Sequence, residues 1–252
     1  MNYKEFGVDN KETMVFLHGG GLSWWNYREV AEELQDTYHI IIPILDGHAG
    51  SDRGFQSIEK NAEEIIEFID ERFGGKVLLI GGLSLGGQIL LEILSGRGDI
   101  CRYAMIESAM VIPSKITNAL MRPALSSCYG LIRRQWFSKL QFKSLHMKQE
   151  LFKEYFRDTC GIAKADYIGF LKANTEYTLK PSIEKCAADV HIFFGDRETR
   201  GILRSAERIR DSISNAKIHK IKGLYHGEFS ISHAKRYAEM IEKIRKLKVI
   251  LT

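Results

Sequence analysis

The chain has 252 residues, 44% of them hydrophobic and 27% charged, and this ordinary globular composition excludes a disordered or collagen-like protein. A chain of this length can bury a sizeable core, as one large α/β domain or two small ones. The mean hydropathy is -0.19. No apolar run approaches the roughly 18 to 20 residues that a membrane helix needs, so we expect no membrane span. The net charge of +4 is mild.

Neither the N-terminus nor the cysteines indicate secretion. Residues Met1 to Glu12 are polar and lack the apolar core of a signal peptide, so the sequence predicts a cytoplasmic protein. No two of the eight histidines stand four residues apart and no C-x-x-C pair occurs, so no metal site is expected. The cysteines are widely spaced and predicted to be reduced thiols: Cys101, Cys128, Cys160 and Cys186.

Short apolar runs alternate with stretches of helical spacing in most of the chain. The runs of strand length, rich in β-branched and aromatic residues, are Thr13 to Leu17, His39 to Leu45, Lys76 to Ile80, Arg102 to Ile106 and Val190 to Phe194. Between the first four of them, apolar residues recur at helical spacing over 27–34, 58–69 and 89–94. This alternation predicts an α/β fold with a doubly wound, mostly parallel sheet.

The alternation stops near Val111 and resumes near Asp189. The residues between have helical spacing, many aromatics and no convincing strand, which predicts a helical insertion at 111–185 within a core domain of 1–110 and 186–252. A helix near 202–213, a strand at 217–221 and a C-terminal helix complete the prediction. The last helix has apolar residues at Tyr237, Ile241, Ile244, Leu247 and Leu251.

The segment Gly82-Leu83-Ser84-Leu85-Gly86 follows a predicted strand and precedes a predicted helix, the context of a G-x-S-x-G nucleophile elbow. The glycines have a physical reason, because so sharp a turn leaves no room for side chains two residues either side of the serine. A phosphate-binding loop is excluded, since Gln88 and Ile89 stand where a Walker A loop needs Lys and Ser or Thr. Ser84 is therefore the predicted nucleophile.

A glycine run, His18-Gly19-Gly20-Gly21, comes directly after the first predicted strand. Without side chains in the way, backbone N–H groups can approach a developing oxyanion. The predicted oxyanion hole uses the N–H groups of Gly20 and Leu85, with Gly21 as the alternative to Gly20.

Together these motifs resemble the α/β-hydrolase superfamily, in particular its cap-bearing members, and the resemblance covers essentially the whole chain. It rests on HGGG, the turn Asp46 to Ser51, the GLSLGG elbow and a late GLYHG at 223–227. The family order of serine, acid and histidine implies His226, in that late turn, as the base. His219 lies inside a predicted strand and His233 near the start of the last helix, where ordinary surface or packing roles are expected.

The acid is less narrowly defined. The strand at 190–194 is followed by Gly195-Asp196-Arg197-Glu198, and the resemblance places the acid three residues after the glycine, at Glu198. A buried carboxylate of either length can hold an imidazole tautomer and stabilise imidazolium. Asp196 is the alternative and Glu107 the third candidate. The two that are not the acid are expected to be helix caps or solvated ion pairs.

The resemblance implies a serine hydrolase of carboxylic esters, acting through an acyl-enzyme and needing no metal or organic cofactor. Acyl transfer, C–C bond hydrolysis and lyase chemistry on the same triad remain alternatives, and a non-catalytic ligand-binding protein is a further one. The expected partner is a small-molecule ester or acyl substrate. No nucleic acid is expected, and the oligomeric state stays open.

The insertion at 111–185 falls where the family carries a cap over its active site. Its aromatic residues could line an apolar acyl or aryl pocket, although packing cap helices together is the ordinary fate of such residues. It holds 13 lysines and arginines against 6 acidic residues, a net charge of +7, which leaves -3 for the rest of the chain. Solvated helix faces would explain this basicity. Alternatively, a basic lid attracts an anionic substrate or an acidic surface.

Overall fold

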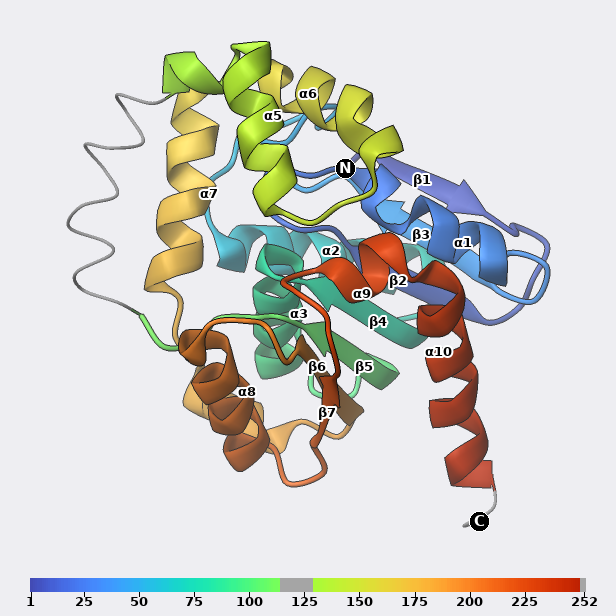
Figure 1. Cartoon of the computed structure of the whole chain (residues 1–252). Helices are drawn as coiled ribbons and strands as arrows, with labels where there is room; N and C mark the ends of the chain where they lie inside the picture. Colours follow the sequence, from blue (N-terminus) through green and yellow to red (C-terminus); the bar gives the residue numbers. More distant parts are fainter. Residues whose placement is uncertain (114–128, 250–252) are drawn as a thin grey trace.

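The fold is known from a computed structural model that describes residues 1–113 and 129–249. Within them, seven strands form one sheet in the order β1-β3-β2-β4-β5-β6-β7 (Figure 1). The strands are β1 (Tyr3–Phe6), β2 (Thr13–Leu17), β3 (His39–Pro43), β4 (Val77–Leu83), β5 (Cys101–Glu107), β6 (Asp189–Gly195) and β7 (Lys217–Ile221). Only β1 runs antiparallel to its neighbour among these described strands. The predicted doubly wound, mostly parallel sheet is confirmed.

Helices cover both faces of this sheet. They are α1 (Arg28–Leu34), α2 (Ile58–Phe73), α3 (Leu85–Gly96), α5 (Gln135–Ser144), α6 (Phe152–Gly161), α7 (Lys164–Glu176), α8 (Arg200–Ser212), α9 (Glu228–Ser232) and α10 (Ala234–Val249). Short 3-10 turns lie at Trp24–Tyr27, Gln149–Leu151 and Pro181–Lys185. No helix among the described residues is long and apolar enough to span a bilayer.

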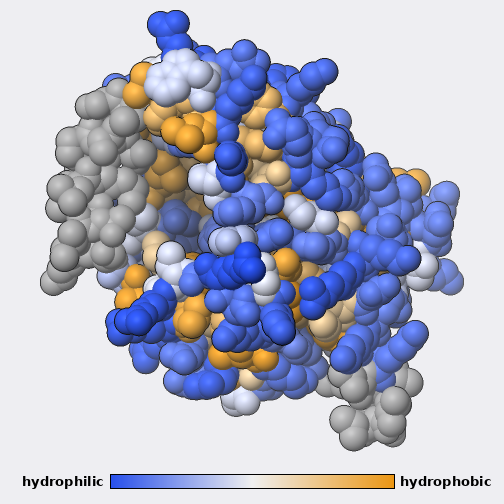
Figure 2. All heavy atoms as spheres, in the orientation of Figure 1, coloured by the Kyte–Doolittle hydropathy of each residue, from blue (hydrophilic) through white to orange (hydrophobic). Residues whose placement is uncertain are grey.

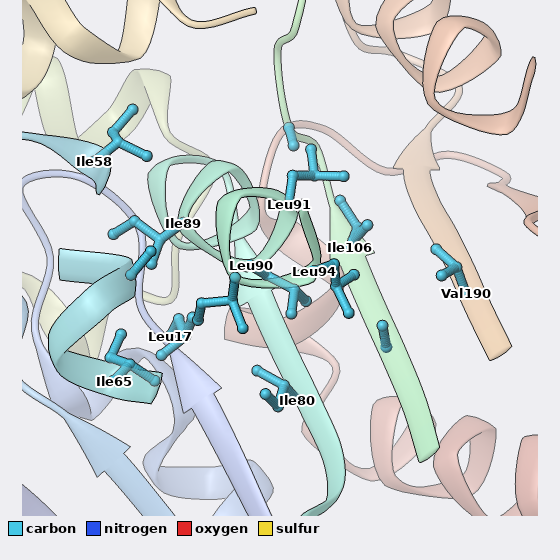
Figure 3. Packing of buried hydrophobic residues seen from close by; sticks show 14 of the residues in the cluster. Leu17, Ile58, Ile65, Ile80, Ile89, Leu90, Leu91, Leu94, Ile106 and Val190 are labelled. Carbon is cyan, nitrogen blue, oxygen red and sulfur yellow. The ribbon is translucent and has the colours of Figure 1, made fainter. Parts of the chain in front are cut away.

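Each strand serves two hydrophobic cores, because successive side chains point to opposite faces. Val15 and Leu17 of β2 belong to the core under α2, α3 and α8, whereas Met14 and Phe16 belong to the core under α1, α9 and α10. In Figure 3, Leu90 of α3 lies over the sheet on the first of these faces. Strands buried on both faces explain why the central runs are continuously apolar.

Besides shifts of one or two residues at strand ends, such as β3 ending at Pro43 and not at Leu45, the structure corrects the predicted strands at two places. An edge strand, β1, lies in the segment taken as a polar terminus, and its partly exposed residues carry no apolar run that would signal a strand. The strand predicted at 76–80 begins at Val77 and continues to Leu83, because Gly81 and Gly82 belong to the sheet despite their low strand propensity. Cys128 and Leu251 lie outside the described residues.

The predicted insertion is helical in the part that the structure describes, 129–185, where α5, α6 and α7 lie over the carboxyl ends of the parallel strands (Figure 1). Residues 114–128 lie outside the described ranges. Helix α7 is joined to α3 through Asn174, whose Nδ2 donates to Gln88 Oε1 at 3.0 Å, while Gln88 Nε2 donates to the Asn174 carbonyl oxygen at 2.7 Å. These bonds hold the inserted helices close to the turn that carries Ser84.

Candidate active site

Ser84 lies at the turn between β4 and α3, with a φ of 52° and a ψ of -109°. Residues with a side chain rarely adopt this conformation, so the surrounding structure must hold it. The Ser84 N–H donates to the Glu107 carbonyl oxygen at 2.8 Å, and the Gln88 N–H donates to the Ser84 carbonyl oxygen at 3.0 Å. The turn is thus anchored to the end of β5 and to the first turn of α3.

The glycines beside Ser84 are required by close backbone approach. A Cβ on Gly82 would lie 2.4 Å from the Gly86 carbonyl oxygen, and a Cβ on Gly86 would lie 2.1 Å from the Leu17 carbonyl oxygen. Neither neighbour is the end of a flexible side chain. The steric reason predicted for these glycines is therefore present in the structure.

His226 lies in the turn between β7 and α9, and its Nδ1 is 2.8 Å from Glu198 Oε2. The Glu198 side chain is only 1% exposed. Its other oxygen, Oε1, accepts from Ser108 Oγ at 2.7 Å and from the Gly195 N–H at 2.9 Å. Because an ionised carboxylate can only accept, the proton of a neutral His226 lies on Nδ1. Its Nε2 then carries the lone pair that a general base needs.

The other two candidate acids have different partners. Asp196 Oδ1 accepts from the Gly223 N–H at 2.7 Å and so joins the loop after β6 to the turn after β7. Glu107 is buried, and its Oε1 accepts from the N–H groups of Phe229 and Ser230 at 3.2 and 3.4 Å. Of the three carboxylates, the structure brings Glu198 within hydrogen-bond distance of His226.

Burial raises the pKa of Glu107 from its ordinary value of 4.5 to about 7; the negative charge of Glu198 acts in the same direction, and hydrogen bonds from Ser230 oppose the shift. A carboxyl group whose pKa is raised in the folded state stabilises the fold fully below its unfolded pKa, and this contribution is lost as the pH rises toward 7. At neutral pH and above, Glu107 therefore destabilises the protein.

Replacing Glu107 with glutamine should reveal this contribution. The amide oxygen can still accept from the N–H groups of α9, but the side chain no longer titrates. The free energy of unfolding of Glu107→Gln, relative to wild type, should increase by about 2.5 kcal/mol between about pH 5 and about pH 8. Urea denaturation of both proteins across this range measures the difference. Parallel stability curves would contradict the raised pKa.

Ser84 and His226 line one cavity of about 250 Å³. Much of the remaining wall is apolar, from Leu22, Leu83, Leu145, Met147, Phe170, Leu171 and Ile231. Its polar side chains are Gln141, Ser144, Tyr155, Thr159 and Tyr167, all from the inserted helices and the segments beside them. Figure 2 shows the surface hollowed beneath α5, with hydrophobic residues at the hollow. Other aromatic residues of the insertion, such as Phe142 and Phe152, pack on each other instead.

The proposed oxyanion donors lie beside the same cavity. A Cβ on Gly20 would lie 3.5 Å from the Leu85 side chain, so the glycine run and the start of α3 are adjacent. The Gly21 N–H already donates to His48 Nε2 at 3.0 Å. Among the described residues, the N–H groups of Gly20 and Leu85 have no protein acceptor. This arrangement favours Gly20 over Gly21 as the first donor.

His48 holds the glycine run in place, a role that sequence reasoning missed. Burial lowers the pKa of His48 to about 4, so the imidazole is neutral at pH 7. Its Nδ1 bonds the Asp46 carbonyl oxygen at 3.0 Å, which leaves Nε2 as the acceptor for Gly21. The ring also stacks on Phe170 of α7, with centroids 4.5 Å apart. One side chain thus links the glycine run to the inserted helices.

His18 acts similarly at the other end of the run. Burial lowers the pKa of this histidine to about 3, with the nearby His48 acting in the same direction. Its Nδ1 lies 3.0 Å from the Gly19 carbonyl oxygen, and its Nε2 accepts from the Leu45 N–H at 3.1 Å. Two neutral imidazoles therefore tie the glycine run to the segment that follows β3.

Ser108 is a second residue that sequence reasoning missed. It is buried, has a φ of 55°, and donates to Glu198 from ninety residues away in the chain. Its N–H donates to the Phe193 carbonyl oxygen of β6 at 2.9 Å. No local pattern signals such a contact, because it depends on the pairing of β5 with β6. Among the described residues, no group of three or more histidine, cysteine or acidic side chains could hold a metal ion.

Both a sequence profile and solved structures of known proteins are similar to this chain. The sequence profile of the alpha/beta hydrolase family matches residues 14–240. Among solved structures, the chain is similar to MenH from S. aureus, with 18% identity, a TM-score of 0.78 and coverage of 98% of both chains. It is also similar to a thermophilic esterase from Thermogutta terrifontis, with 18% identity, a TM-score of 0.75 and coverage of 97% of this chain and 93% of the other. It is similar as well to an enol-lactonase from Burkholderia xenovorans, with 12% identity, a TM-score of 0.77 and coverage of 97% of this chain and 96% of the other. At these identities the likenesses show the fold.

Proposed function

The chain belongs to the alpha/beta hydrolase family, and from that premise we propose that it is a serine hydrolase of small carboxylic esters, with Ser84, His226 and Glu198 as its triad. The observation that carries the proposal is the hydrogen bond of 2.8 Å between His226 Nδ1 and the buried Glu198, on a histidine that shares a cavity with Ser84. A binding protein has no physical need for a nucleophile and a base in one cavity.

The chemistry follows from the protonation state of His226. Its Nε2 takes the proton of Ser84 Oγ as the oxygen attacks the acyl carbon, and the carbonyl electron pair moves onto the carbonyl oxygen. The N–H groups of Gly20 and Leu85 stabilise this oxyanion. When the C–O bond to the leaving alcohol breaks, His226 returns the proton to that alcohol. Water then repeats both steps on the acyl-enzyme and releases the acid.

Glu198 suits its role because its position is fixed from two sides. Ser108 and the Gly195 N–H hold one oxygen, so the other remains directed at His226. A buried carboxylate there stabilises the imidazolium that forms in each half-reaction. No step of this mechanism needs a metal or an organic cofactor.

The volume and the wall of the cavity limit the size and polarity of the substrate. A volume of about 250 Å³ with a largely apolar wall suits a small or medium acyl or aryl group. Residues 111–185 act in this proposal as a cap, since the described inserted helices supply Tyr155, Tyr167 and Phe170 to the wall. We therefore expect short esters to be turned over better than long ones.

A fluorophosphonate probe tests the proposal directly, because it phosphonylates a serine only where a base and an oxyanion hole activate it. Wild-type protein should be labelled, with peptide mapping placing the label on Ser84, and Ser84→Ala should not react. Ser144→Ala is the matched control, since Ser144 lines the same cavity and its loss should leave labelling intact. Wild-type protein that resists the probe would refute the hydrolase assignment.

A further inference from the structure

Helix α5 carries an apolar pair on its outer side. Ser138 and Phe142 are buried. The Phe142 ring packs on the rings of Phe152 and Tyr155, with a distance of 5.3 Å between ring centroids in each pair. Away from this side, Trp136 and Leu140 stand one helical turn apart, and each is 64% exposed. Figure 1 shows α5 at the surface of the molecule. The exposed fractions of Trp136 and Leu140 show that both side chains face solvent.

Four cations surround this pair: Arg133, Arg134, Lys139 and Lys143. All four are exposed, and within the described residues none forms an ion pair with an acidic side chain. The sequence contains no Asp or Glu between Glu107 and Glu150. Glu150 lines the same surface depression as Lys139, but no ion pair joins the two side chains in the described structure. Two of them lie over aromatic rings, Arg133 over Tyr129 and Lys139 over Phe152, and Arg133 Nη2 also donates to the Tyr129 hydroxyl at 2.7 Å. No ion pair within residues 1–113 and 129–249 therefore neutralises their positive charge.

This combination differs from an ordinary solvated face. Some basic residues nearby are paired, Arg28 with Glu154 and Arg157 with Asp158, whereas these four are not. Exposed Trp and Leu at helical spacing, bordered by unpaired cations, have the chemistry of a helix that rests at the interface of an anionic bilayer. The cations meet lipid phosphates and the apolar pair enters the boundary of the acyl chains. A nucleic-acid strand would offer nothing for Leu140 to bury against.

We propose that this α5 face, defined by Arg133, Arg134, Trp136, Lys139, Leu140 and Lys143, docks the protein on an anionic lipid surface. The same helix supplies Gln141 to the cavity wall, and Ser144 at its end lines the cavity as well. Docking therefore places the cavity beside the bilayer, where apolar esters concentrate. Lipid binding itself does not depend on Ser84, so it can be tested apart from the proposed hydrolase activity.

Sedimentation with unilamellar vesicles tests the docking. Wild-type protein should bind vesicles that contain phosphatidylserine about tenfold or more tightly than vesicles of phosphatidylcholine alone, and added salt should weaken the binding. The triple variant Arg134→Gln, Lys139→Gln, Lys143→Gln should lose most of this preference. The double variant Trp136→Ala, Leu140→Ala should bind more weakly than wild type even at low salt, because the apolar anchor is gone.

The matched control is Arg204→Gln with Arg208→Gln on α8, two exposed arginines of a helix without an exposed Trp or Leu. This variant should bind as wild type does. Equal binding to both vesicle types would overturn the proposal, as would an equal loss in the α8 control. Ser84→Ala should still sediment with anionic vesicles, so a failed hydrolase assignment and a failed docking surface remain distinguishable. The positions substituted on the α5 face and in the α8 control are all exposed, and circular dichroism checks that each variant is folded.

Discussion

Replacing Ser84 with alanine is expected to lower the turnover of short p-nitrophenyl esters by ~10⁴- to 10⁶-fold. Without Oγ no acyl-enzyme can form. A water molecule activated by His226 would have to attack the ester instead, and it is a poorer nucleophile than a serine held in position by the turn. Binding of the ester should change little, because the apolar cavity wall remains. Steady-state kinetics on purified protein measures both effects.

The same kinetics on Ser144→Ala provide the comparison. Ser144 lines the cavity, yet it donates to the Gln141 carbonyl oxygen at 2.6 Å and has no place in the proposed chemistry. Its loss should leave turnover near that of wild type. If Ser84→Ala retained about a tenth of wild-type turnover, the nucleophile would have to be sought elsewhere. Thermal unfolding of both variants separates lost chemistry from lost structure.

The central part of the fold was predictable because its signal is local. Strands buried on both faces must be apolar throughout, and Val15 and Met14 illustrate this by serving opposite cores. The glycines of the Ser84 turn were predictable for a similar reason, since close approach of Gly86 to Leu17 leaves no room for a side chain. The strand β1 was missed because an edge strand needs no continuous apolar run.

The candidate site was predictable only in part. Ser84 and His226 stand in motifs that can be recognised from neighbouring residues, whereas the choice among the three carboxylates depends on the path of the loop after β6. The contacts of Ser108 and His48 join segments far apart in the chain, and neither residue belongs to a periodic pattern. Such positions become visible only when the sheet register brings their partners together.

The second large effect is expected at Glu198, where glutamine keeps the shape but reverses one hydrogen bond. Ser108 and the Gly195 N–H both donate to Oε1, so the amide oxygen must take that place. The amide NH₂ then faces His226 Nδ1, where the carboxylate oxygen had accepted a hydrogen bond. His226 is forced into the tautomer with its proton on Nε2, which cannot accept the proton of Ser84. Turnover of Glu198→Gln should fall by ~10⁴-fold.

Asp196→Asn is the matched control for this argument, because it makes the same chemical change two residues away. Asp196 Oδ1 accepts from the Gly223 N–H, and an amide oxygen can accept the same bond. Turnover should therefore stay close to wild type, with at most a small loss of stability in the exposed loop. The comparison of the two variants on one short ester decides between the two acids. A severe loss in Asp196→Asn beside a mild one in Glu198→Gln would transfer the acid role to Asp196, and would require the loop after β6 to shift in the working enzyme.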